Sequence, residues 1–147
     1  MAHYTTTRYD VNQVARLNCA EMIIMVHQGP KGLVDHLLNV QATAISQRNK
    51  TVELRAKVSH ACDVIDKNLA QIEERAVGYR RMGIPTDQLV QLYIDSYNKW
   101  EEMLSRYEEL DNEVQAADKV LKEVDAKLDY WQQQRMNYVN SQEWWRD

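Results

Sequence analysis

The sequence predicts an all-α protein: a long antiparallel helical hairpin or coiled coil, of about residues 33–81 with 87–145, preceded by a shorter helix at about 10–28. Only 4 Gly and 2 Pro interrupt its 147 residues, whereas strong helix formers are abundant. Mean hydropathy is −0.63, so we expect the apolar residues, 44% of the chain, to lie in stripes. The third observation is a heptad pattern that runs without interruption after Pro85.

The first expected helix follows a polar arm of residues 1–9. Asp10 is a candidate N-cap, and Gln13 completes the pattern of a capping box. The apolar run Met22–Val26 makes the second half of this helix apolar nearly all round, which predicts burial on more than one side. At residues 29–32, Gly-Pro-Lys-Gly predicts a corner, because a proline cannot continue a regular helix. This tetrapeptide lacks the glycine spacing of a phosphate-binding loop.

The second expected helix, about residues 33–81, carries an inner apolar stripe. Polar residues at 48–51, with Thr51 as a candidate cap, leave open whether this helix breaks there. Gly83 stands where a helix C′ glycine is expected, and Pro85 prevents continuation. Residues 82–86 are therefore the predicted hairpin turn, with Thr86 capping the next helix. The stripe consists of Val34, Leu37, Leu38, Gln41, Ile45, Val58, Ala61, Ile65, Leu69, Ile72, Ala76 and Tyr79.

The third expected helix carries the heptad seam, whose positions alternate in steps of four and three. This spacing is typical of a left-handed coiled coil. Because the turn at 82–86 is short, the second helix is its natural antiparallel partner. Folding near residue 84 would bring Trp131 close to Leu37. The seam consists of Leu89, Tyr93, Ser96, Trp100, Met103, Tyr107, Leu110, Val114, Ala117, Leu121, Val124, Leu128 and Trp131.

Length and charge indicate one domain that does not bind nucleic acid. The net charge is −4 and the pI about 5.6, and we interpret the basic residues near position 50 as a solvated face. Residues 1–10 lack the apolar core of a signal peptide, and Met22–Val26 is too short to span a membrane. We therefore expect synthesis in the cytoplasm without membrane insertion. Cys19 and Cys62 are expected to be free, buried thiols.

No constellation of catalytic groups is visible in the sequence. The histidines, at positions 3, 27, 36 and 60, are scattered, and none belongs to a His-Glu-x-x-His pair that could bind zinc. The carboxylates lie beside the seam and are interpreted as a solvated face. We expect no enzymatic activity, no metal and no cofactor.

Aromatic and apolar residues supply the candidate contacts with partner proteins. Trp100 and Trp131 fall on the seam, where core packing is the favoured interpretation and partner contact the alternative. Trp144 and Trp145 would point about 100° apart on a helix, so both cannot face one seam. Tryptophan and methionine are enriched at protein interfaces. The candidate interaction residues are Met22, Ile23, Met25, Val26, Trp100, Trp131, Trp144 and Trp145.

Two resemblances point to flagellar and type III export. The plan of residues 65–136 is similar to the stalk protein of the export apparatus. The start of the chain resembles the flagellin export chaperones, although Asn18-Cys19 stands where that family has Ser-Pro. This resemblance implies a chaperone that binds a client helix. The residues that carry it at the start of the chain are Tyr9, Val14, Glu21, Met22, Ile23, Met25 and Gly29. Further along, Val58, Ala61, Val64 and Ile65 loosely resemble a later helix of the same family.

The leading hypothesis is a structural or adaptor subunit of a larger protein assembly, such as a virion or a secretion machine. The long seam and the terminal tryptophans favour a homo-oligomer or a multi-protein complex. The alternative is the export or assembly chaperone, whose apolar first helix would hold a client helix.

Overall fold

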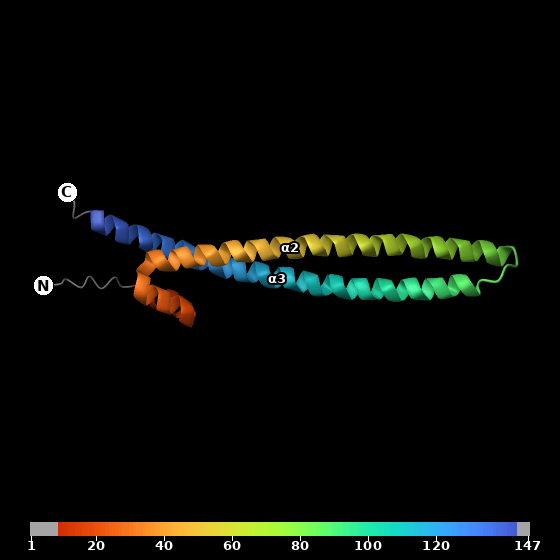
Figure 1. The fold of residues 1–147 in the computed structure, drawn as a ribbon, viewed down its shortest axis with the longest axis horizontal. Helices are drawn as coiled ribbons and strands as arrows, with labels where there is room; N and C mark the ends of the chain where they lie inside the picture. Colours follow the sequence, from red (N-terminus) through yellow and green to blue (C-terminus); the bar gives the residue numbers. More distant parts are fainter. Residues whose placement is uncertain (1–8, 144–147) are drawn as a thin grey trace. The chain divides into compact units, whose positions relative to one another are not determined.

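A computed structural model describes residues 9–143, with side chains placed for residues 9–140. It contains three helices, α1 (Val11–Ala15), α2 (Cys19–Arg81) and α3 (Asp87–Glu143), and no strand in the described part (Figure 1). The all-α prediction and the pairing of two long helices are confirmed. Contacts divide the chain into two compact units. Unit 1 joins the residues up to Ser46 with those from Asp118 onward, and unit 2 is Gln47–Ala117.

The short N-terminal helix is confirmed, but the single helix expected at about 10–28 is interrupted at residues 16–18. Asp10 does cap α1, because its Oδ1 accepts the N–H of Asn12 at 2.9 Å. Gln13 does not complete a capping box, and its Oε1 is buried without a hydrogen-bond partner. The helix ends after Ala15, and Leu17 beyond it is buried in the core. The chain therefore makes a short helix, a break and a new helix.

A capping box starts α2, although none was predicted at this position. The Asn18 side-chain oxygen accepts the N–H of Glu21 at 2.8 Å, and the Glu21 carboxylate accepts the N–H of Asn18 at 2.9 Å. Each side chain thus satisfies a backbone donor that the first helical turn leaves unpaired. This reciprocal pair explains why the chain re-enters a helix three residues after leaving α1.

The predicted corner at residues 29–32 is present within α2, where the non-helical Gly29 separates two helical segments. Gly29 has φ 71° and ψ −169°, and helical geometry resumes with the buried Pro30. A positive φ of this kind favours glycine, because other residues meet a clash at Cβ. No second break occurs at 48–51. The Thr51 hydroxyl instead donates to the Gln47 carbonyl at 3.0 Å, one helical turn earlier.

The hairpin turn has the geometry that its glycine predicts. Gly83 has φ 71°, and the N–H of Ile84 reaches back to the Tyr79 carbonyl at 2.8 Å. The N–H of Gly83 donates to the Arg80 carbonyl at 3.2 Å. These two bonds define a Schellman motif. Thr86 precedes α3, and its carbonyl accepts the N–H of Val90 at 2.9 Å.

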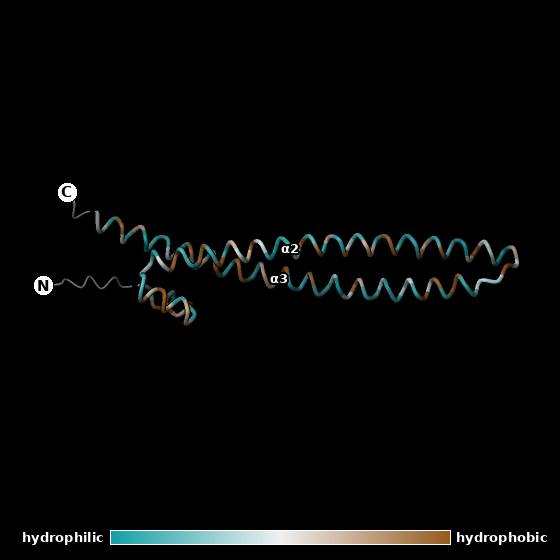
Figure 2. Tube along the Cα trace, viewed as in Figure 1, coloured by the Kyte–Doolittle hydropathy of each residue, from teal (hydrophilic) through white to brown (hydrophobic). Residues whose placement is uncertain are grey.

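The seam of α3 is confirmed. Every seam residue is buried or half-buried, including the polar Ser96. Most of the α2 stripe is covered in the same way. The assignment of Leu38 and Ile45 to this stripe is wrong, since their exposed fractions are 39% and 42%. Leu33, which the predicted stripe omitted, is fully buried. Figure 2 shows apolar and polar residues alternating along both long helices.

In unit 2, α2 and α3 run antiparallel. Arg55 and Asp111 form an ion pair at 2.7 Å, and these two residues are equidistant in sequence from Gly83. This register lies within a residue of the predicted fold point. The buried apolar residues come from both helices and are Val58, Leu69, Ile72, Leu110 and Val114.

Unit 1 holds the larger core. Trp131 is fully buried and packs in one cluster with Leu37, as predicted. The Trp131 ring also meets Tyr9 with 5.1 Å between centroids and Tyr130 with 5.0 Å. The Tyr130 hydroxyl accepts the N–H of Asp10 at 2.8 Å, which ties α1 to α3. The core cluster is Leu17, Leu33, Val34, Leu37, Val124, Leu128 and Trp131.

Candidate protein-interaction surface

One ion pair fixes the first turns of α2 on α3 within unit 1. Lys127 Nζ donates to Glu21 Oε1 at 2.9 Å and to Oε2 at 3.3 Å. The Glu21 side chain is only 4% exposed and that of Lys127 17%. Glu21 therefore serves both as half of the capping box and as the buried partner of Lys127. Its side chain orients the helical segment 19–28.

This orientation gives segment 19–28 two unlike faces. Glu21, Ile24 and Met25 share the face that meets the core and Lys127. The opposite face consists of Cys19, Met22, Ile23 and Val26, which follow the i, i+3, i+4, i+7 spacing of one helical stripe. We call these four residues the outer stripe. Cys19 is exposed, and Met22, Ile23 and Val26 are 44%, 59% and 79% exposed.

The prediction that Met22–Val26 is buried on more than one side is therefore wrong for this chain by itself. Segment 19–28 has covering residues on one face only, and the apolar outer stripe is left to solvent. Met25, also a candidate contact, packs against the core and is half-buried. An amphipathic helix normally turns its polar face outward, so the exposed apolar stripe is a candidate contact surface.

The other candidate contacts have mixed outcomes. Trp131 belongs to the core cluster, so the favoured interpretation, that this residue packs in the core, is confirmed. Trp100 is half-buried, and its ring lies 5.8 Å from that of Tyr97. Trp144 and Trp145 lie outside the described residues, and their role stays a prediction.

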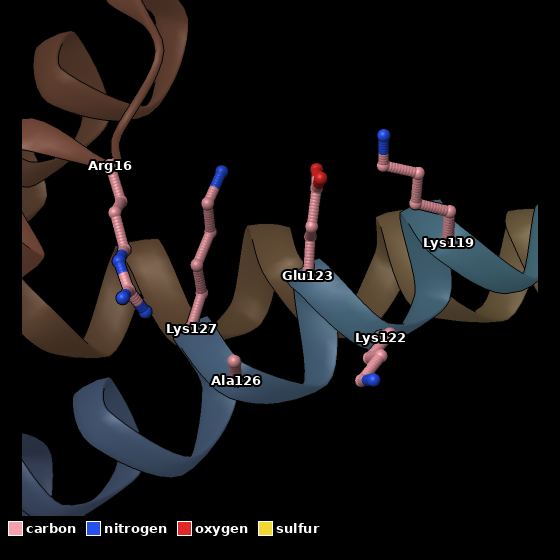
Figure 3. Close-up of a pocket in the computed structure, with 6 residues that line it drawn as sticks. All are labelled: Arg16, Lys119, Lys122, Glu123, Ala126 and Lys127. Atoms are coloured by element: carbon pink, nitrogen blue, oxygen red, sulfur yellow. The ribbon is translucent and has the colours of Figure 1, made fainter.

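A cavity of about 570 Å³ in unit 1 is lined by cationic side chains (Figure 3). Lys119, Glu123 and Lys127 rise from one face of α3, Arg16 approaches from the break after α1, and Lys122 points away from the others. Lys127 is already bound to Glu21, and Glu123 adds an opposing charge. The cations do not converge on one point, so this cavity has the character of a solvated charged face.

Within residues 9–143 no group of three or more His, Cys, Asp or Glu side chains is placed to hold a metal ion. In the same range, no helix combines the length and apolarity that crossing a membrane requires.

The two cysteines are free, as predicted, but Cys19 is exposed and Cys62 half-buried. Burial raises the pKa of the Cys62 thiol, and the nearby Asp66 and Asp63 raise it further. A raised pKa means less reactive thiolate at a given pH.

In dilute, monomeric protein we therefore expect a thiol reagent at pH 8 to modify Cys19 roughly tenfold faster than Cys62. The Cys62 rate should keep rising with pH above the range where an ordinary thiol is fully ionised. Stopped-flow kinetics on the variants Cys62→Ser and Cys19→Ser measure each thiol separately. Equal rates for the two thiols would contradict the exposure and charge described here.

No protein-family model matches the chain, and neither does any curated protein or solved structure. The two resemblances to flagellar export proteins therefore stay predictions.

Proposed function

We propose that this protein is a non-enzymatic structural or adaptor subunit that binds other protein chains through the outer stripe, Cys19, Met22, Ile23 and Val26. The assembly would be of the kind found in a virion or a secretion machine, built from cytoplasmically synthesised chains. The observation that supports the proposal is the exposure of an apolar stripe on a helix held in place by a buried ion pair.

The stripe can supply useful binding energy. Full burial of one large apolar side chain is worth about 1.5–3 kcal/mol, and the stripe presents three of them within two helical turns. Because the capping box and Lys127 already order the segment, little conformational entropy is lost when a partner docks. An apolar helical face of this spacing fits a helix-in-groove or helix-on-helix contact.

The alternative function is an export or assembly chaperone that binds a client helix. The same stripe favours it, because an amphipathic client helix could cover Met22, Ile23 and Val26. The two functions differ in what the isolated protein does. A structural subunit associates with copies of itself, whereas a chaperone stays monomeric until its client is added.

The proposal is tested by sedimentation velocity with Val26→Asp and a matched control, Val77→Asp. Both valines are exposed in α2, but only Val26 belongs to the outer stripe. We expect wild type to self-associate, Val26→Asp to weaken association at least tenfold, which is about 1.4 kcal/mol, and Val77→Asp to match wild type. Circular dichroism should show equal helicity in all three.

A monomeric wild type that shifts only with an added client would favour the chaperone. Association that Val26→Asp leaves unchanged would contradict both functions. The double change Trp144→Ala and Trp145→Ala belongs in the same experiment, because the sequence predicts that it also weakens assembly.

A further inference from the structure

Unit 2 contains a groove between α2 and α3. Two neighbouring cavities, of about 320 and 280 Å³, share Glu73 and Tyr93 as lining residues. The first continues towards the hairpin turn and the second away from it. The remaining lining residues are Ile72, Ala76, Arg80, Leu89 and Val90 for the first cavity, and Asp66, Leu69, Ala70, Tyr97 and Trp100 for the second.

Small residues line part of this groove. Ala70 and Ala76 stand on its α2 side, where their short side chains leave space between the two helices. Tyr97 lies one position beyond the seam and is 41% exposed. Its ring is therefore available above the groove.

Three aromatic rings form a row along one wall. The Tyr93 and Tyr97 rings are stacked, with 6.4 Å between centroids and 11° between planes. Trp100 continues the row, tilted by 31° against Tyr97 at 5.8 Å. Such a row offers flat π faces, which attract flat or cationic groups, above all the guanidinium of arginine.

Carboxylates border the same groove. Asp66 and Glu73 are seven residues apart, which places them on one face of α2, and both line the second cavity. The Glu73 carboxylate lies beside the Tyr93 hydroxyl at the groove, and by accepting a hydrogen bond from it raises the pKa of the Tyr93 phenol. Asp66 makes no hydrogen bond or ion pair with the described residues. The aromatic wall thus faces uncompensated negative charge, whereas Arg80 lines the end near the turn.

We propose that this groove binds an extended, basic segment of a partner protein, with arginine side chains stacked on Tyr97 and Trp100 and paired with Asp66 and Glu73. The groove runs along α2 from residue 66 to residue 80, roughly 21 Å at about 1.5 Å per residue. An extended segment of about six or seven residues spans that length at about 3.1 Å per residue. Arg80 at the far end disfavours a second cationic side chain there.

Charge complementarity selects this occupant over others. Nucleic acid and acidic peptides carry charge of the same sign as Asp66 and Glu73 and would be repelled. A plain apolar helix would bury the two carboxylates without partners, which is costly. Only a cationic segment satisfies the rings and the carboxylates together.

The test titrates the full chain with a fluorescently labelled hexa-arginine peptide and measures fluorescence anisotropy. Glu73→Gln is compared with Glu74→Gln, because these adjacent glutamates differ in one respect. Only Glu73 lines the groove, and glutamine there can still accept the Tyr93 hydrogen bond. We expect Glu73→Gln and Tyr97→Ala each to weaken binding at least fivefold, Glu74→Gln to stay within twofold of wild type, and hexa-glutamate not to bind.

No binding of hexa-arginine to wild type, or equal losses for Glu73→Gln and Glu74→Gln, would overturn the proposal. Equal losses would show that the peptide responds only to overall negative charge. Thermal melting of each variant separates lost binding from lost folding, and Tyr97→Leu serves if Tyr97→Ala does not fold. This inference rests on the proposed role as a protein-binding subunit, but its outcome is independent of the outer stripe. Val26→Asp should bind hexa-arginine as wild type does.

Discussion

Val124→Asp should unfold unit 1 at denaturant concentrations where wild type stays folded. Val124 is 6% exposed and belongs to the core cluster with Leu128 and Trp131. An aspartate there would be a charge in an apolar contact with no partner, which we expect to lower the free energy of unfolding by about 3 kcal/mol or more. Urea unfolding followed by circular dichroism measures the loss.

The neighbouring change Glu123→Gln is the matched control. Glu123 lies on the exposed face of α3 beside Val124, so its replacement should alter stability by no more than about 0.5 kcal/mol. Similar small effects for both variants would mean that the seam is not a buried contact.

Lys127→Ala should also be strongly destabilising. It removes the cation that pairs with Glu21, whose side chain is 4% exposed, and leaves a buried negative charge with no cationic partner and only the Asn18 N–H as a donor. Breaking a buried pair in this way commonly costs about 3–5 kcal/mol. Since the Lys127 side chain retains 17% exposure, we expect the lower end of that range, measured by the same urea unfolding.

Two further variants isolate the cause of this loss. Lys122→Ala removes an exposed lysine of the same helix and should be nearly silent. Adding Glu21→Gln to Lys127→Ala should recover part of the stability, because glutamine is uncharged and can still cap α2. A double variant less stable than Lys127→Ala alone would show that the charge of Glu21 is not the source of the cost.

Local sequence patterns were sufficient to predict the hairpin of α2 and α3. The seam repeats over many turns, and Gly83 followed by Pro85 leaves few alternatives for the chain. The resulting Schellman motif and the burial of the seam agree with the sequence-based expectation. Leu38 and Ile45 were assigned to the wrong face because helical spacing alone does not say which of two adjacent stripes a partner helix covers.

The start of the chain could not be predicted in the same way. Asp10 with Gln13 and Asn18 with Glu21 both satisfy the capping-box pattern, and both Asp10 and Asn18 cap a helix, but only the second pair forms the full box. Local spacing also does not show that Lys127 pairs with Glu21 from 106 residues away in sequence. That same contact turns Met22, Ile23 and Val26 outward. The sequence therefore shows that these residues are apolar, but it does not show that they face solvent.

The aromatic groove was missed for a related reason. Tyr97 lies one position off the seam and was not singled out. A signal was present, because Tyr93, Tyr97 and Trp100 follow one another in steps of four and three and so share one side of a helix. What it could not show is that Tyr93, Tyr97 and Trp100 line up beside Glu73, since the pairing of α2 with α3 sets that arrangement.

The central claim is that another protein chain covers the outer stripe, and the exposed thiol of Cys19 reports on it directly. In a Cys62→Ser background, the rate at which a thiol reagent modifies Cys19 is measured from dilute protein up to concentrations at which sedimentation shows association. We predict that the rate falls at least tenfold as the chains associate, because the stripe becomes buried between them. A Cys19 rate that stays constant while the chains associate would contradict the account, since the contact would then lie elsewhere.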